Sequence, residues 1–250
     1  RDSSTSRGLG DVYKRQILYT PRPSEFISIQ HGYIIAVDGV VVYCGESIPP
    51  AYADREVTDY GDNLIIPGFV DTHAHAPQYC NRGLGMDKEL LPWLETYTFP
   101  EEAKFSDLDY ARLVYGAFVQ DLWRNGTTRS ILFGTIHKES TLVLMELLQK
   151  AGLSAYVGKV NMDCNSPDFL IEETSQSLAD TKDWLEASAQ FGPLVKPIIT
   201  PRFVPSCTSE LMDGLGTLSE EYKVPVQSHL SENHGEIDWV GALHPESPNY

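Results

Sequence analysis

The sequence predicts an α/β fold, an incomplete (β/α)8 TIM-like barrel preceded by a small portion of a β-sandwich. Three observations support this prediction. From residue 67 onward, short apolar and β-branched runs alternate with segments whose apolar residues recur at helical spacing. Glycine follows several of these segments, as is typical of helix ends. Residues 23–66 contain strand and turn signals instead.

The expected β unit covers residues 23–66 and contains a clear hairpin signal. Apolar runs at 33–37 and 40–43 flank the pair Asp38-Gly39. An Asp-Gly pair between apolar runs favours a tight hairpin turn, so we expect two paired strands here.

Residues 1–22 differ in composition from the rest of the chain. They begin with Arg1 rather than Met and hold five Lys or Arg against two Asp or Glu. They show no apolar periodicity. We therefore expect a non-native-looking leader that takes no part in the fold.

The barrel region is expected to cover residues 67–250 and to hold about five βα units. The expected strands are 64–72, 127–133, 154–160, 195–200 and 225–229, and the expected helices are 107–124, 139–150, 172–190 and 209–222. Parallel strands need such crossover helices. Eight units typically require about 250 residues, so we expect a barrel that is truncated at its C-terminus.

The composition excludes several classes of partner. The chain holds 19 Lys and Arg against 35 Asp and Glu, for a formal net charge of −16. Such a charge argues against nucleic acid or an anionic membrane as the main partner. No apolar run approaches the roughly 20 residues that span a bilayer. The four cysteines are widely spaced, which predicts free thiols and a cytoplasmic protein.

Metal-binding residue types lie at the expected strand ends. His73 and His75 close the first barrel strand, and side chains two apart on a strand point the same way. Two imidazoles at a strand end can bind one cation. His229 ends a later strand, and Glu232 follows it. A carboxylate near such a site can move protons between a metal-activated water and a leaving amine.

Four sequence blocks together resemble the amidohydrolase superfamily and, within it, the guanine deaminases. These blocks are PGFVDTHAHAPQY at 67–79, WLETYTFP at 93–100, TPRF at 200–203 and SHLSEN at 228–233. The two histidines alone would indicate only the superfamily. Gln78 and the pair Arg202-Phe203 favour a guanine-type substrate.

The resemblance implies a zinc-dependent barrel that hydrolyses guanine to xanthine and ammonia. It implies one Zn²⁺ per subunit bound by His73, His75 and His229, with Glu232 as the catalytic proton shuttle. The implied substrate-binding residues are His75, Gln78, Arg202, Phe203, His229 and Glu232. It also implies a small β-sandwich built from both chain ends, and a homodimer when the protein has its full length.

The sequence departs from the family pattern after Glu232. The family completes its site with a further histidine and an aspartate from later barrel strands. Here only His234, His244 and Asp238 follow, all in the next helix or loop. We therefore expect the chain alone to be inactive. Two alternatives stay open: another amidohydrolase that deaminates or dechlorinates amino-substituted heterocycles, and a non-catalytic scaffold.

Four other residues attract attention but receive no main role. His137 follows the second barrel strand, and we expect packing in preference to a pocket role. His31 belongs to the β unit and is expected to be structural, and Cys80 is a lone thiol with no adjacent base. Asp87 is expected to be a loop carboxylate.

Overall fold

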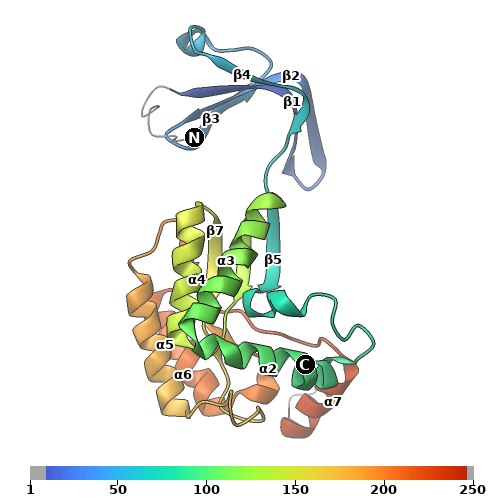
Figure 1. The fold of residues 1–250 in the computed structure, drawn as a ribbon, viewed down its shortest axis with the longest axis vertical. Helices are drawn as coiled ribbons and strands as arrows, with labels where there is room; N and C mark the ends of the chain where they lie inside the picture. The colour runs from blue at the N-terminus through green and yellow to red at the C-terminus, as the bar shows by residue number, and fades with distance from the viewer. Residues whose placement is uncertain (1–9, 247–250) are drawn as a thin grey trace. The chain divides into compact units, whose positions relative to one another are not determined.

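The computed structural model describes residues 10–246, which divide into two compact units on either side of the Gly68–Phe69 junction (Figure 1). The predicted boundary between 66 and 67 lies close to this division. Pro67 and Gly68 separate the last strand of the first unit from the first strand of the second. The expected single strand at 64–72 is therefore wrong, because β4 ends at Ile65 and β5 begins at Phe69.

The first unit is a four-stranded sheet with the strand order β3-β2-β1-β4. Its elements are β1 (Asp11–Arg22), β2 (Glu25–Val37), β3 (Val40–Gly45), a 3₁₀ turn η1 (Pro50–Tyr52) and β4 (Val57–Ile65). β2 pairs antiparallel with β1 and β3, and β4 pairs parallel with β1. The hairpin predicted at Asp38-Gly39 forms with Val37 opposite Val40, and both turn residues have positive φ.

The prediction that residues 1–22 lie outside the fold is wrong for the part that the structure describes. β1 is an inner strand of the first sheet, and Val12 and Ile17 on it are buried. Residues 1–9 lie outside the described part of the chain. The leader prediction failed because a bulge between Arg15 and Ile17 breaks the alternation of apolar residues.

The basic residues of β1 have a structural explanation. Lys14 lies 3.1 Å from Asp59, and Arg15 lies 3.1 Å from Asp62, both across the pairing with β4. The positive charges of Lys14 and Arg15 are therefore matched by acidic residues on the neighbouring strand.

The second unit is built on parallel strands. Four of them pair in the order β5-β6-β7-β9, namely β5 (Phe69–His75), β6 (Thr127–Phe133), β7 (Ser154–Gly158) and β9 (Val195–Pro197). Beyond β7 and β9 the chain continues as a second parallel pair, β8 (Val160–Asn161) and β10 (Thr200–Pro201). The strand expected at 225–229 is reduced to a parallel bridge between Ile199 and Val226. Five successive βα units of an incomplete barrel are therefore present.

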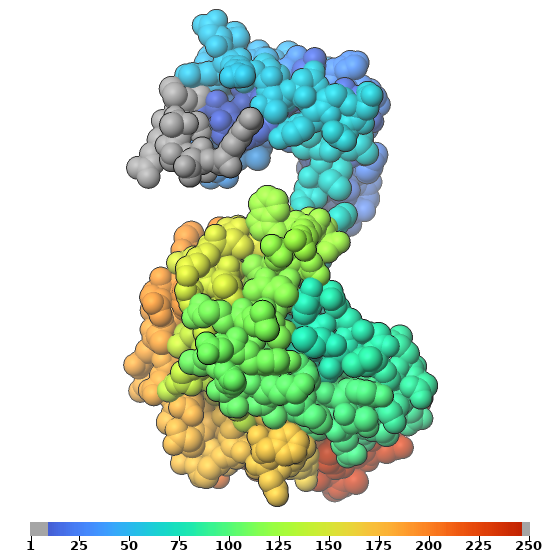
Figure 2. All heavy atoms as spheres, viewed as in Figure 1, coloured from blue at the N-terminus to red at the C-terminus, as the bar shows by residue number. Residues whose placement is uncertain are grey.

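Helices follow the strands as the crossover geometry requires. They are α3 (Leu108–Arg124), α4 (Lys138–Ala151), α5 (Thr174–Ser188), α6 (Ser209–Tyr222) and α7 (His234–Leu243). The side chains of α3 and α4 make up much of the visible face of this unit in Figure 2. The main core lies between helices and strands and includes Tyr115, Leu132, Leu144 and Trp184, all fully buried.

A long insertion between β5 and α3 is the main element that the sequence reading missed. It contains a 3₁₀ turn η2 (Ala76–Asn81), α1 (Leu90–Trp93), a π-helical turn η3 (Leu94–Thr98), α2 (Phe99–Glu102) and a 3₁₀ turn η4 (Ala103–Ser106). Its helical pieces are too short to show apolar periodicity in the sequence. No helix within residues 10–246 is long and apolar enough to cross a membrane.

Candidate metal centre and adjoining pocket

Three histidines meet at the ends of the parallel strands. His73 and His75 lie at the end of β5, and His229 follows the bridge at Val226. One nitrogen from each of the three rings lies within 4.8 Å of the others. The Nε2 atoms of His75 and His229 face each other at 2.9 Å. This is the cluster that the sequence predicted.

A bulge at the end of β5 helps to aim these rings. The register between β5 and β6 shifts between Asp71 and Ala74, so β5 carries one extra residue there. The Asp71 carboxylate accepts a hydrogen bond from the His73 backbone N–H at 3.1 Å. Asp71 thus supports the strand end and is absent from the cluster of ligand atoms.

The protonation states of the cluster suit metal binding. Burial holds the pKa of His75 well below its usual value, and the Arg202 guanidinium lowers it further. Burial lowers the pKa of His229 to about 4, although the hydrogen bond to the Arg202 carbonyl raises it in part. Both rings are therefore neutral at pH 7, which is the form that binds a metal.

The outer nitrogens of these rings also favour a metal site. His229 Nδ1 donates to the backbone carbonyl oxygen of Arg202 at 2.6 Å, which leaves the lone pair on Nε2. His75 Nδ1 is buried and has no hydrogen-bond partner among the described residues. Three imidazoles that converge in this way fit a divalent transition metal such as zinc.

The ring of Phe133 packs against the histidine cluster. It stacks on His75 with the centroids 4.5 Å apart and lies 4.3 Å from the ring of His229. Phe133 ends β6 and is fully buried. Nothing in the sequence indicated this role, since a phenylalanine at a strand end is typical of ordinary core.

A cavity of about 130 Å³ adjoins the histidines. Its lining includes every site residue predicted from the sequence, namely His73, His75, Gln78, Arg202, Phe203, His229 and Glu232. It also includes three apolar residues that were not predicted: Leu90, Trp93 and Leu94. These come from α1 and the start of the π-helical turn, and such turns occur frequently at functional sites. The WLETYTFP block at 93–100 was the only sequence signal for Trp93 and Leu94, and it does not include Leu90.

Arg202 connects the cavity with the histidine cluster. Its backbone carbonyl accepts from His229, as described above, while its guanidinium makes a two-pronged ion pair with Glu102. The Nη1–Oε2 distance is 2.6 Å and the Nη2–Oε1 distance is 3.1 Å. Glu102 also accepts from Gln78 Nε2 at 3.2 Å. Sequence reasoning missed Glu102 because it lies in the insertion.

Glu232 borders the cavity and is suited to proton transfer. Partial burial raises the pKa of its carboxyl group, and the neighbouring Glu236 carboxylate raises it further. The backbone N–H of Glu232 donates to Glu236 Oε2 at 2.7 Å, which anchors the loop before α7. A carboxyl group with a raised pKa exchanges protons more readily near neutral pH.

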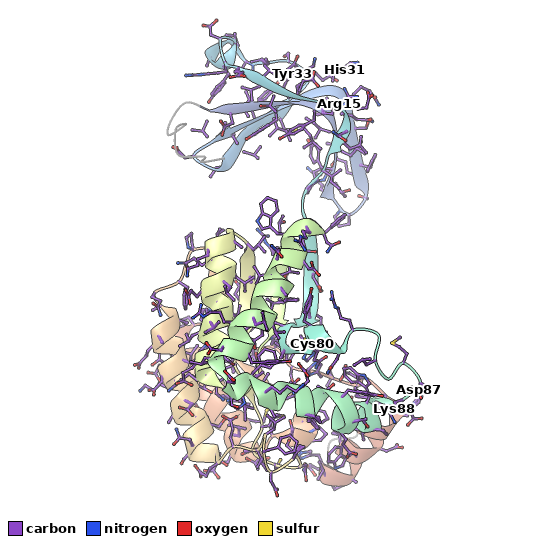
Figure 3. All side chains as sticks on the ribbon, viewed as in Figure 1. Arg15, His31, Tyr33, Cys80, Asp87 and Lys88 are labelled. Atoms are coloured by element: carbon purple, nitrogen blue, oxygen red, sulfur yellow. The ribbon has the colours of Figure 1, made fainter. Side chains whose placement is uncertain are left out.

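The residues that sequence reasoning set aside stay away from the cavity lining. His137 is the residue before α4, and burial lowers its pKa, followed by the charge of Lys159. Figure 3 shows His31 in the first sheet, with Asp87 in the loop that follows β5 and η2. Cys80 is exposed, with its sulfur 4.0 Å from the Tyr110 hydroxyl. None of the four lines the cavity.

Comparisons with known proteins agree with this arrangement. The sequence model of the "Amidohydrolase family" matches residues 64–250. Guanine deaminase from Dictyostelium discoideum is 52% identical over 197 residues, which cover 78% of this chain and 44% of that protein. Guanine deaminase from Escherichia coli K12 is 39% identical over 229 residues, covering 89% of this chain and 51% of that protein.

Solved structures give the same result. The guanine deaminase from C. acetobutylicum, with guanine bound in its active site, superposes with a TM-score of 0.94 at 51% identity. That match covers 96% of this chain and 57% of the other. The chain thus spans about half the length of the relatives that it matches. Fold and sequence confirm the resemblance drawn from the motifs, and the chain belongs to the amidohydrolase family.

Proposed function

We propose that the protein containing this chain deaminates guanine hydrolytically to xanthine and ammonia, with one Zn²⁺ per subunit. The observation that carries the proposal is a single cavity that joins three convergent imidazoles to the predicted pocket residues Gln78, Arg202 and Phe203. Guanine as the substrate is suggested by the C. acetobutylicum enzyme, which has guanine bound in its active site.

The chemistry assigns a task to each side of the cavity. His73, His75 and His229 would hold the zinc ion, which as a Lewis acid supplies a usable nucleophile from water at neutral pH. Glu232 would take one proton from the attacking water and pass it to the ring nitrogen, and would then carry the second proton of that water to the leaving amine. The water oxygen adds at C2, and the C–N bond to the 2-amino group then breaks as the C2 carbonyl forms and ammonia leaves.

The base would be held by groups on the other side of the cavity. Arg202 can donate hydrogen bonds to a ring carbonyl oxygen, and the Gln78 amide can complement the adjacent ring edge. Phe203 offers an aromatic face. Leu90 and Trp93 also line the cavity and add apolar surface to it.

The 250-residue chain alone is proposed to be inactive. The family takes a further histidine and an aspartate from later strands, and His234, His244 and Asp238 do not replace them. Among the described residues, none of these three joins the cluster of His73, His75 and His229. A homodimer in the cytoplasm stays a prediction for the full-length protein.

The test is a comparison of the 250-residue chain with a full-length version of the protein. Zinc content would be measured by elemental analysis and xanthine formation by absorbance. We expect about one zinc per full-length subunit, guanine turnover by that version, and none by the short chain. Zinc without guanine turnover, but with release of ammonia or chloride from another amino-substituted heterocycle, would favour a different amidohydrolase. Absence of both zinc and turnover would favour a non-catalytic scaffold.

A variant of Arg202 tests the pocket assignment separately. Arg202→Ala should lower kcat/KM for guanine by about 100-fold or more, since a buried site built around a donor loses its partner. The zinc content should stay at the wild-type level, because the His229 partner is the backbone carbonyl of residue 202. Unchanged guanine turnover would contradict the assignment.

A further inference from the structure

The geometry points to a role for Glu102 that neither the motifs nor the comparisons assign. We propose that Glu102 is a positioning residue that fixes the hydrogen-bond pattern of the pocket, so that it accepts a purine with a ring carbonyl beside a ring N–H. This inference rests on the proposed deamination of guanine and names the residue that sets its selectivity.

Glu102 contacts the two polar residues that would read the base. Its carboxylate binds Arg202 through two N–H groups and Gln78 through one. Glu102 is 1% exposed and Arg202 is 2% exposed, so water does not compete for these bonds. The Phe99 ring packs beside the guanidinium, with its centroid 5.1 Å from Arg202 Cζ. The buried Glu102–Arg202 pair and the partly buried Gln78 therefore form one hydrogen-bonded unit.

The ionised carboxylate of Glu102 decides how Gln78 is oriented. A carboxylate only accepts hydrogen bonds, so Gln78 must turn its NH₂ group toward Glu102. The amide oxygen of Gln78 is then the atom left to accept from a ligand. A neutral side chain at position 102 would not impose this choice.

The same carboxylate leaves Arg202 with donors to spare. A guanidinium has five N–H donors, and Glu102 takes one from each of two nitrogens. The cavity therefore presents donors from Arg202 and an acceptor from Gln78. The edge of guanine at C6 and N1 carries a carbonyl and an N–H, which complement this pair. An amino group at C6 with an unprotonated N1 presents the opposite pattern.

A matched pair of substrates can test this reading. 2,6-Diaminopurine has the same 2-amino leaving group as guanine, but it has an amino group at C6 and an acceptor at N1. The measured quantity is kcat/KM for guanine divided by kcat/KM for 2,6-diaminopurine, in the full-length protein. A general loss of folded enzyme lowers both values equally and leaves the ratio unchanged.

Glu102→Gln is the decisive variant because it keeps the shape and removes the charge. Its amide can donate as well as accept, so Gln78 is free to turn over. We expect the ratio to fall by about tenfold or more, mainly through a higher KM for guanine, with the zinc content unchanged. Glu102→Asp keeps the charge but shortens the side chain by one methylene group, so we expect a smaller fall in the same ratio.

Glu101→Gln is the control, since Glu101 is a buried neighbour on α2 with other partners. It bonds to Lys104 and Tyr110 and does not line the cavity. This variant should keep the wild-type ratio. A wild-type ratio in both Glu102 variants would overturn the role of Glu102 while leaving the deaminase proposal intact. Absence of guanine turnover by the wild-type protein would overturn the deaminase proposal and this inference together.

Discussion

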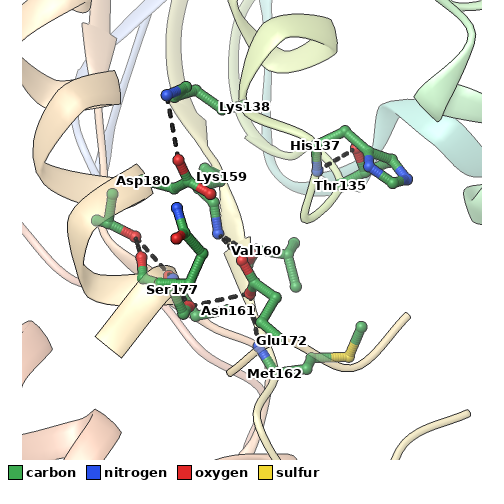
Figure 4. A network of polar contacts seen from close by, with 12 residues as sticks. Thr135, His137, Lys138, Lys159, Val160, Asn161, Met162, Glu172, Ser177 and Asp180 are labelled. Atoms are coloured by element: carbon green, nitrogen blue, oxygen red, sulfur yellow. Dashed lines mark hydrogen bonds and ion pairs between the residues drawn. The ribbon is translucent and has the colours of Figure 1, made fainter. Parts of the chain in front are cut away.

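Two buried ion pairs in the second unit contrast with each other. Arg202 and Glu102 are 3% and 1% exposed at their side chains, and Lys159 and Glu172 are 0% and 10% exposed. The shortest N–O distance is 2.6 Å in each pair. Their surroundings differ, because the first pair borders a cavity and the second lies in a packed polar network (Figure 4).

The Lys159 pair has every donor used. Lys159 Nζ donates to the Val160 carbonyl at 3.1 Å and to Glu172 at 2.6 Å. With the Asn161 amide turned so that its oxygen faces the ammonium group, that oxygen accepts the third proton at 3.3 Å. An ammonium group has three donors, so none is left for a ligand. Arg202 keeps donors free, and this difference is the basis for the proposal that its ion pair helps to bind a ligand while the Lys159 pair stabilises the fold.

The largest expected effect concerns Glu232, which lines the cavity. Glu232→Gln should lower kcat for guanine by roughly 10²–10⁴-fold in the full-length protein, because the proton shuttle is removed. The Tm should change little, since Glu232 remains open to the cavity. Steady-state kinetics and thermal unfolding of the same preparation would measure both. A large loss of stability would instead indicate that Glu232 has a structural role.

The next largest effect concerns the Lys159–Glu172 pair, in which every donor of Lys159 is used. Lys159→Met should destabilise the protein by about 3–5 kcal/mol, because it leaves the Glu172 carboxylate partly buried without its cation. Urea unfolding would measure the change. The ratio of guanine to 2,6-diaminopurine use should stay at the wild-type value in the protein that remains folded. A changed ratio would show that the network also acts on the pocket.

A double variant distinguishes the lost pair from lost packing. Lys159→Met combined with Glu172→Met removes both charges and keeps apolar volume in the interior. We expect it to recover much of the stability, since a buried ion pair replaced as a whole is often close to neutral. No recovery would indicate that the hydrogen bonds from Met162 and Ser177 to Glu172 carry the effect.

The sequence predicted those parts of the structure that depend on local patterns. β6 and α6 have the predicted bounds, and helix α3 begins after Asp107, whose carboxylate caps its first turn. The three histidines could be predicted because the ends of parallel strands meet at one edge of the sheet. In each case the signal lies within a few residues of the chain.

The parts that could not be predicted depend on distant partners. Lys14 in β1 looked like part of a basic leader because Asp59 lies far along the chain. Glu102 and Arg202 are 100 residues apart, and nothing near Glu102 indicates that its carboxylate is buried. Phe133 reads as core until the histidines stack on it. Such roles come from tertiary contacts, which a single sequence does not reveal.

The smallest expected effect lies at the surface end of the polar network, where Lys138 pairs with Asp180 at 3.1 Å (Figure 4). Lys138 also pairs with Asp183 at 3.3 Å. The hydrogen bond to Asp180 raises the pKa of Lys138. The contribution of this cation is therefore complete at pH 7 and disappears only as the pH rises through the raised pKa.

Lys138→Ala should cost at most about 1 kcal/mol, because water and salt screen a partly exposed pair. The loss, measured by urea unfolding at low salt, should shrink further in 1 M NaCl. Lys159→Met in the same two buffers is the matched comparison, and its larger loss should persist because salt does not reach the buried pair. If salt reduced the loss of stability equally in both variants, the Lys159 pair would not be shielded from salt in the way proposed here.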